Sequence, residues 1–193
     1  MTTQLRIPIT DNGKKLEVAS KPTTTPVSRE ALIDGLNHDL AGEYQAILMY
    51  THYSAKLTGP YRRELRALLQ AELADEQRHA QFLADKVAAL GGEPTTDHHT
   101  VPHADQPREM LEHVLAAEKQ AIEDYTARIW QAVNAADIGL KVMLENQVAD
   151  ETRHKEEIER ILAGWNELNL ERARNEDRWQ DDDEGEGYPL NPK

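Results

Sequence analysis

The sequence predicts an all-α fold in which four helices pack as a bundle. Four long stretches rich in Ala, Leu, Glu and Arg carry apolar residues at helical spacing. The 10 Gly and 9 Pro lie mostly in clusters or at the chain ends, where they would end helices rather than interrupt them. The second half of the chain also repeats the pattern of the first. These features predict two copies of one helical hairpin, joined into a four-helix bundle.

Turn and cap signals give the bounds of the four helices. Ser28, Asp105 and Asp137 are candidate N-caps, and Pro60 and Pro107 suit the first turn of a helix. Gly91-Gly92 ends the second helix. The predicted helices cover residues 28–57, 60–90, 107–135 and 137–164, with a helical turn or two beyond.

The chain divides into one core domain and two tails. Residues 1–27 show no sustained period, which predicts an extended arm. Residues 28–165 form the predicted bundle, and 166–193 a short helical turn followed by an acidic, disordered tail. The polar segment 91–106 is long enough to cross the bundle, but its spacing alone also allows a plain up-down-up-down connection.

Composition excludes several function classes. Cys is absent, so thiolate metal sites, disulfides and Cys nucleophiles are excluded. The formal net charge of -13 argues against nucleic acid or an anionic membrane as a partner. No segment approaches about 18 consecutive apolar residues, and no apolar run of signal-peptide type opens the chain. We therefore expect a cytoplasmic protein.

The repeat, at an offset of 75 residues, brings acidic and histidine side chains together. Segments 36–51 and 111–126 are identical at ten of sixteen positions. In each hairpin a lone Glu precedes the Glu of an E-x-x-H motif by 33 residues, and the two lie equally far from the predicted turn. Side chains at equal distance from a turn share one level of antiparallel helices. The six residues are Glu43, Glu76, His79, Glu118, Glu151 and His154.

Such a set suits a pair of metal ions. Four buried carboxylates are costly unless they are neutralised, and two divalent cations would supply the balancing charge. Carboxylate and imidazole ligands favour iron or manganese, and the lack of thiolate disfavours a structural zinc site. The alternative is that these are ordinary exposed residues, but one chance E-x-x-H would not recur with the same lone Glu at the same spacing.

The pattern Glu43…Glu76-x-x-His79…Glu118…Glu151-x-x-His154 resembles the ligand set of the ferritin-like di-iron superfamily, and is most similar to that of bacterioferritins. The resemblance covers about residues 28 to 165. It implies a ferritin-like bundle with a long crossover loop at 91–106. It also implies two iron ions at these six residues, with oxygen or peroxide as the oxidant of Fe(II).

Differences at particular positions narrow down which branch of the superfamily this sequence resembles. Gln77 stands where haem-binding bacterioferritins have Met, so no haem is expected. Ala121 stands where rubrerythrins have an extra Glu, and their Cys-bound iron is excluded here. Small starvation-induced cage proteins lack the second E-x-x-H. The resemblance implies a homo-oligomer, anywhere from a dimer to a 24-subunit cage.

Four further residues are candidates for supporting the ligands. Asp75 and Asp150 directly precede the E-x-x-H glutamates, and carboxylates commonly accept the free N–H of a metal-bound imidazole. Tyr50 and Tyr125 each lie seven residues after a lone Glu, on the same helix face. The simpler alternatives are a solvated Asp-Arg pair and core tyrosines.

Three functions remain open. The first is a ferroxidase that oxidises Fe(II) to Fe(III) for iron storage or detoxification. The second is a di-iron or di-manganese oxidase or peroxide scavenger acting on another substrate. The third is a bundle whose metals only hold the helices together. The histidines of the 91–106 segment, His98, His99 and His103, are either solvated or bind passing cations.

Overall fold

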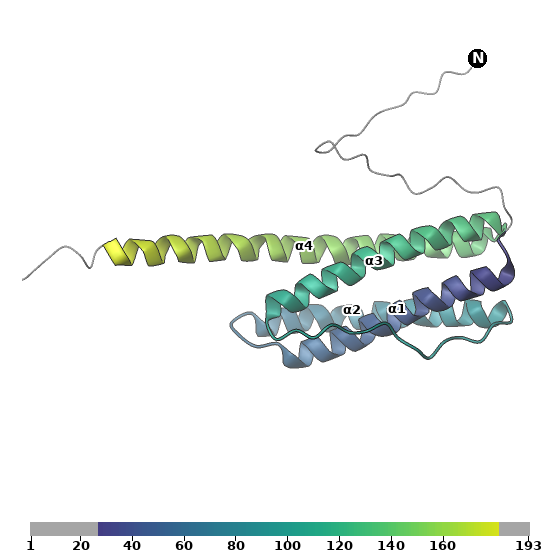
Figure 1. Cartoon of the computed structure of the whole chain (residues 1–193), viewed down its shortest axis with the longest axis horizontal. Helices are drawn as coiled ribbons and strands as arrows, with labels where there is room; N and C mark the ends of the chain where they lie inside the picture. The colour runs from purple at the N-terminus through teal and green to yellow at the C-terminus, as the bar shows by residue number, and fades with distance from the viewer. Residues whose placement is uncertain (1–26, 182–193) are drawn as a thin grey trace, which may run out of the picture.

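The described part of the chain is all-α, as predicted. The computed structural model describes residues 27–181, and their side chains as far as Trp165. Four helices form in this range (Figure 1): α1 (Arg29–Lys56), α2 (Arg62–Ala89), α3 (Pro107–Asn134) and α4 (Ile138–Asp181). The predicted arm, up to residue 26, and the predicted acidic tail, from 182 onward, lie outside the described residues. No helix within 27–181 is both long and apolar enough to cross a bilayer.

Local signals explain where the helices begin. Ser28 caps α1, since its Oγ accepts a hydrogen bond from Ala31 N at 3.1 Å. Asp137 does the same for α4, accepting from Leu140 N at 2.9 Å. Pro107 is the first residue of α3, where its missing N–H costs nothing.

Two of these expectations need small corrections. Pro60 lies in the turn before α2 rather than in its first helical position, because the helix begins at Arg62. Asp105 does not cap α3. Its carboxylate instead accepts from Lys56 Nζ at 2.8 Å, and Gln106 precedes the helix without a side-chain cap.

α4 continues well past the predicted end of the fourth helix. Gly164 is the expected stop, yet the helix runs to Asp181. Gly ends helices when it adopts a left-handed conformation, as Gly91 does after α2 with φ 76°. Gly164 does not have a positive φ, and no Pro follows before Pro189. A single helical Gly costs only about 1 kcal/mol, which does not end a helix that good helix formers continue.

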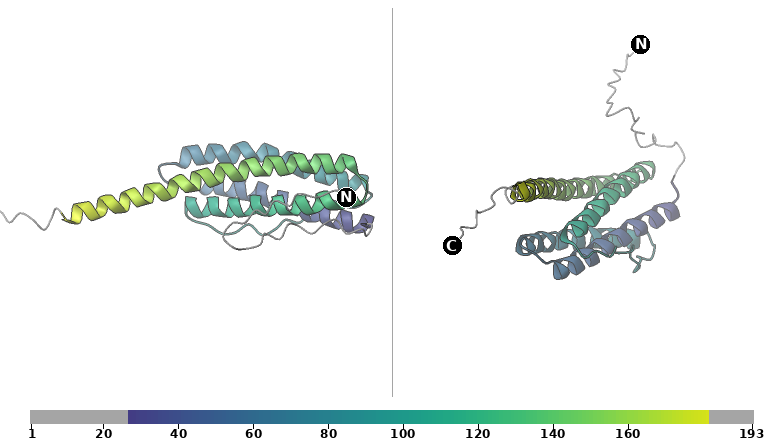
Figure 2. Two further views of the ribbon diagram at one scale, coloured as in Figure 1. Left: turned by 90° about the horizontal axis from the view of Figure 1, so that it is seen from above. Right: turned by 60° about the vertical axis from the view of Figure 1, so that its left-hand side comes forward.

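The segment between α2 and α3 is a long crossover. It runs beside α1 over the length of that helix (Figure 2), from Asn37 Nδ2, which donates to Glu93 O at 3.0 Å, to Lys56 Nζ, which donates to Ala104 O at 2.6 Å. Side-chain pairs then give the helix directions: Asp39 meets Arg128 across α1 and α3. The bundle is therefore up-down-down-up, and the crossover is confirmed.

Two apolar clusters fill the core, one towards each end of the bundle. The first includes Met49, Tyr53, Leu69 and Met110; the second lies around Leu36, Leu40, Leu83, Ala132 and Leu144. The helix positions between the clusters carry charged side chains. The fold thus places a polar layer inside an apolar bundle.

A buried ion pair fastens α1 to α3 beside this layer. Asp39 and Arg128 are 5% and 6% exposed, and their side chains approach at 2.8 Å and 3.1 Å. Arg128 occupies the space above Gly35, where an added Cβ would lie 1.6 Å from Nη1. Gly35 is therefore the residue that makes room for the pair.

We predict that Gly35→Ala lowers the free energy of unfolding. The methyl group would displace the guanidinium and leave Asp39 buried without its partner, a loss of about 2 to 4 kcal/mol after the gain in helix propensity. Urea unfolding followed by circular dichroism measures it. Gly164→Ala is the matched control, because its Cβ would meet nothing within 4 Å and should add up to about 1 kcal/mol. Equal stability of Gly35→Ala and the parent would contradict the prediction.

Candidate metal centre

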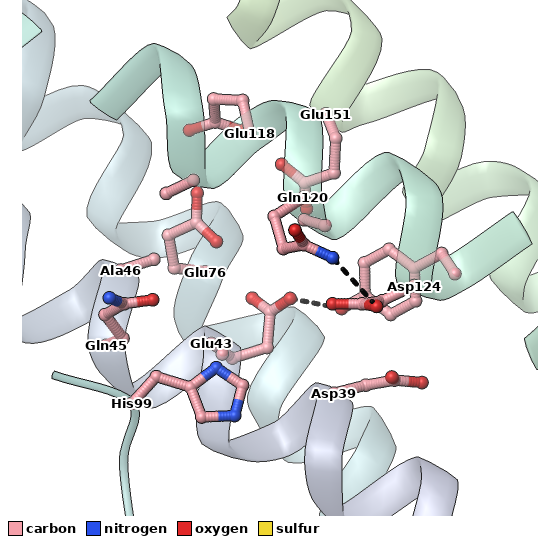
Figure 3. A pocket seen from close by; sticks show the side chains of 14 residues that line it. Asp39, Glu43, Gln45, Ala46, Glu76, His99, Glu118, Gln120, Asp124 and Glu151 are labelled. Carbon is pink, nitrogen blue, oxygen red and sulfur yellow. Dashed lines mark hydrogen bonds between the residues drawn. The ribbon is translucent and has the colours of Figure 1, made fainter. Parts of the chain in front are cut away.

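The structure brings all six predicted side chains together in the polar layer. One lone Glu comes from α1 and one from α3, while α2 and α4 each supply a Glu and a His three residues apart. Each side chain is between 1% and 5% exposed: Glu43, Glu76, His79, Glu118, Glu151 and His154. Figure 3 shows the four glutamates converging from different helices.

The first of two ligand groups surrounds His79. It consists of Glu43, Glu76, His79 and Glu151, whose ligand atoms all lie within 4.8 Å of one another. Nδ1 of His79 is 2.9 Å from Glu151 Oε1 and 3.6 Å from Glu43 Oε2. Three carboxylates and one imidazole nitrogen therefore face a common point.

The second group surrounds His154 and shares two members with the first. It consists of Glu76, Glu118, Glu151 and His154, again within 4.8 Å. Nδ1 of His154 lies 3.3 Å from Glu151 Oε2 and 3.7 Å from Glu118 Oε2. Glu76 and Glu151 belong to both groups, so they would be shared if two cations were bound here, with Glu43 and His79 completing one group and Glu118 and His154 the other.

Unpartnered polar atoms test whether cations fit here. Among the described residues, eight buried side-chain N or O atoms have no hydrogen-bond partner, and seven of them belong to this set, including both oxygens of Glu151 and Nδ1 of both histidines. Buried polar atoms are nearly always satisfied. Hard oxygen donors and imidazole nitrogens gathered without partners are the donor set that Fe, Mn and similar divalent cations bind.

In the absence of a metal, the two histidines are protonated and offset part of the negative charge of the carboxylates. Burial alone lowers the pKa of His79, but contacts with Glu151 and Glu43 outweigh it and raise that pKa to about 10. Burial likewise acts to lower the pKa of His154, but contacts with Glu118 and Glu151 outweigh it and raise that pKa to about 12. Both imidazoles are thus cations at neutral pH in the metal-free protein.

The carboxylates divide into charged and neutral groups. Burial raises the pKa of Glu118 to about 8, although contact with His154 works against it. Burial and the charge of Glu43 hold the pKa of Glu76 well above its usual range. Burial also acts to raise the pKa of Glu151, but the two histidines outweigh it and bring that pKa down to about 2. The division arises because acids crowd together in a site that is largely shielded from water, and only some of them can ionise.

Behind the histidines lies a layer of further carboxylates. Nε2 of His154 is 2.6 Å from Glu72 Oε2 and 3.7 Å from Asp75 Oδ2. Nε2 of His79 is 3.5 Å from Asp150 Oδ2. Both predicted aspartates therefore lie near the imidazoles, but Glu72 is the nearest and sequence reasoning missed it. Its position four residues before Glu76, on the same helix face, is the signal that could have found it.

The two tyrosines contact the lone glutamates crosswise. Tyr50 of α1 donates its phenol to Glu118 of α3, and Tyr125 of α3 donates to Glu43 of α1. Burial raises the pKa of both phenols well above the usual value of 10, so they remain donors at neutral pH. Each tyrosine thereby fixes the orientation of one terminal carboxylate.

The sequence and the fold of this chain are similar to those of known proteins. Residues 33–168 match the Ferritin family, described as a ferritin-like domain. Bacterioferritin of Mycobacterium bovis is 31% identical over 137 residues, 70% of this chain and 86% of that protein. A ferritin-like, diiron-carboxylate protein from Bacillus anthracis is 47% identical with a TM-score of 0.69, covering 69% of this chain and 96% of that one.

A second solved structure leads to the same family. The bacterioferritin of Desulfovibrio desulfuricans superposes with a TM-score of 0.68 at 28% identity, covering 72% of this chain and 82% of that one. The matched family region spans all six convergent residues. The chain belongs to the ferritin-like family, with bacterioferritins among its homologues.

Proposed function

We propose that this protein is a ferroxidase, which oxidises Fe(II) to Fe(III) with dioxygen or peroxide and serves iron storage or detoxification. One observation carries the proposal: two ligand groups of three carboxylates and one imidazole share Glu76 and Glu151. Such sharing holds two cations side by side. The same six residues would then bind the substrate ions and carry out the oxidation.

Charge supports iron as the substrate. Four carboxylates balance two Fe(II) ions, and they favour the more highly charged Fe(III) product over the reactant. The related Bacillus anthracis protein is of the diiron-carboxylate type, and the Desulfovibrio desulfuricans bacterioferritin has a diiron site that is known in different catalytic states. Manganese accepts the same ligands and is the second candidate. With Gln77 in place of Met, the absence of haem stays a prediction.

Electron and proton balance explains why two ions must be held together. Two Fe(II) ions release two electrons, which dioxygen accepts with two protons to give hydrogen peroxide. A second pair of ions reduces that peroxide, with two more protons, to two waters. The chain's part is to hold the ions adjacent, to keep Glu43 and Glu118 oriented through the two tyrosines, and to keep bulk water out.

The size of the adjoining cavity favours a ferroxidase over an oxidase of organic substrates. The cavity that reaches the four glutamates has a volume of about 40 Å³. A water needs about 10 to 15 Å³ on this measure, so the space suits a few waters, dioxygen or peroxide. An organic substrate would not fit beside the centre.

We further propose that the chain forms a homo-oligomer, between a dimer and a 24-subunit cage. Large apolar side chains are exposed near the α3–α4 turn, among them Trp130, Ile138, Val142 and Met143. Such surfaces on a bundle of this size favour burial against another copy. Light scattering after size exclusion measures the assembly.

The first test of the function is Glu151→Gln. A carboxamide cannot bridge two cations, so the initial rate of aerobic Fe(II) oxidation should fall by more than about 100-fold, the upper range for residues that only support a ligand. Ferric absorbance measures the rate. Glu156→Gln, an exposed neighbour on α4, is the control and should leave the rate unchanged. An unaffected rate in Glu151→Gln would contradict the proposal.

A large excess of Fe(II) over the unmodified protein separates storage from other functions. We expect hundreds of irons retained per oligomer, followed by ferric absorbance and particle size. Oxidation that stops near two irons per chain would indicate a resident cofactor. A folded protein with no redox response would instead indicate metals that only hold the helices together.

The pH dependence of metal binding gives an independent test. Because the pKa values of His79, His154 and Glu118 are about 10, 12 and 8 in the metal-free protein, all three carry a proton at neutral pH. Ligands bind in their deprotonated forms, so binding must release protons, and affinity must fall as pH falls, about tenfold per pH unit for each proton released. Co(II) calorimetry in buffers of different ionisation enthalpy counts these protons. Affinity that is constant between about pH 6 and about pH 8 would contradict this account.

A further inference from the structure

A cavity leads from the carboxylates of the centre towards the surface. It lies between α1, α3 and the crossover segment, and Figure 3 looks into it. Its floor is the buried set of Glu43, Glu76, Glu118 and Glu151. Its rim is partly exposed and includes the polar residues His99, Gln45, Gln120 and Asp124, with Gly42, Ala46, Ala117 and Ala121 also lining the cavity.

The crossover segment holds His99 at this rim. Its backbone N–H donates to Ala41 O at 3.1 Å, which fixes the segment to α1 directly above the cavity. Gly42 lies beneath the ring, where an added Cβ would be 3.9 Å from His99 Nδ1. The imidazole is therefore positioned by the fold over the approach to Glu43.

A second histidine, His38, packs behind the rim residues His99 and Asp124. The rings of His38 and His99 pack with centroids 4.6 Å apart, and His38 Nε2 lies 3.5 Å from Asp124 Oδ2. Gln120 Nε2 donates to the other oxygen of Asp124 at 3.1 Å, which orients the carboxylate. Burial, and then the neighbouring His38, lower the pKa of His99, so its ring is neutral at pH 7. Neutral imidazole and carboxylate are ligands for divalent cations.

The opposite side of the centre also carries acids, since Glu72 and Asp75 form with His154 a further group that could hold a metal ion, but two arginines lie beside it. There Arg153 Nη2 lies 3.2 Å from His154 Nε2 and 3.0 Å from Asp75, and Arg78 also pairs with Asp75. Two guanidinium groups repel an approaching cation and occupy the acid that would attract it. On the rim of the cavity, by contrast, no Lys or Arg is among the described residues that line it.

We propose that His99 and Asp124, with His38 packed behind them, form the entrance to the centre and bind a divalent cation in passing. Resting on the proposed function, this inference names the route by which its substrate arrives. The two residues belong to different segments, so the entrance exists only where the crossover lies against α3. They speed access and are not part of the final ligand set.

The kinetics of metal binding distinguish a residue at the entrance from a residue that is a metal ligand. An entrance residue changes the rates of binding and release equally, whereas a ligand changes the equilibrium affinity. Co(II) is the probe, because it is not oxidised under these conditions and its absorbance reports binding at the centre. Stopped-flow mixing with the full-length, metal-free protein gives both rates, and an equilibrium titration gives the affinity and the number of ions per chain.

We expect Asp124→Asn to slow Co(II) binding and release about tenfold, the lower range for electrostatic guidance of a charged ligand. His99→Ala removes a neutral imidazole that can bind the cation in passing, and should slow both rates as well. Affinity and stoichiometry should match those of the parent. His103→Ala is the control and should change nothing, because that side chain is 77% exposed and does not line the cavity. His99→Gln keeps the size and polarity of the side chain without the imidazole, and should also be slow.

Three results would overturn the proposal. Unchanged rates in His99→Ala would mean that cations take another route. Faster binding would mean that the ring only obstructs the cavity. A changed affinity would place His99 in the final ligand set. Co(II) binding needs no oxidation, so it tests the entrance separately from the ferroxidase proposal. Slow Co(II) binding in these variants, with no Fe(II) oxidation by the parent protein, would contradict the ferroxidase proposal and support the entrance.

Discussion

Burial of four carboxylates and two imidazoles at one level of the bundle is the constraint on which the rest of the structure depends. Removing one such charge from water costs several kcal/mol unless something compensates it. The apolar clusters on either side contribute to this cost, because they shield most of the layer between them from water. The crossed tyrosine contacts, the carboxylates behind the histidines and the unpartnered ligand atoms all follow from this one requirement.

Protons and cations are two solutions to the same problem. In the metal-free protein, both histidines, Glu118 and Glu76 carry protons, and Glu151 is held ionised by the two histidines. These protons offset the charge of the crowded acids. Under the proposed function, cations would replace the protons at ligand atoms that already lie close together. A preformed site of this kind binds its ions at little cost in conformational entropy.

The sequence predicts best those parts of the structure that follow from its internal repeat. Antiparallel helices place residues that are equally far from their turn at the same level of the bundle. Counting residues from the two turns is therefore enough to bring the six side chains to one level. Counting from the turns does not single out Glu72, although its spacing from Glu76 places it on the ligand face of the helix, and it leaves His99 as one of three loop histidines. The role of Glu72 depends on how α2 faces α4, and that of His99 on the path of the crossover. The length of α4 also escapes prediction, because a Gly inside a helix and a Gly that ends one look alike in the sequence.

The repeat also shows where the two halves differ. An offset of 75 residues pairs Glu72 with Gln147, so only one half has a carboxylate at that position. His154 Nε2 accordingly has a carboxylate at 2.6 Å, whereas the closest to His79 Nε2 is Asp150 at 3.5 Å, and Gln147 Oε1 is buried without a partner. A carboxylate beside Nε2 makes the imidazole a stronger donor through Nδ1. Two cations bound by the same types of ligand would thus contact histidines of unequal donor strength. The difference arises from a residue behind the histidines, at a position where the two halves of the repeat are not alike.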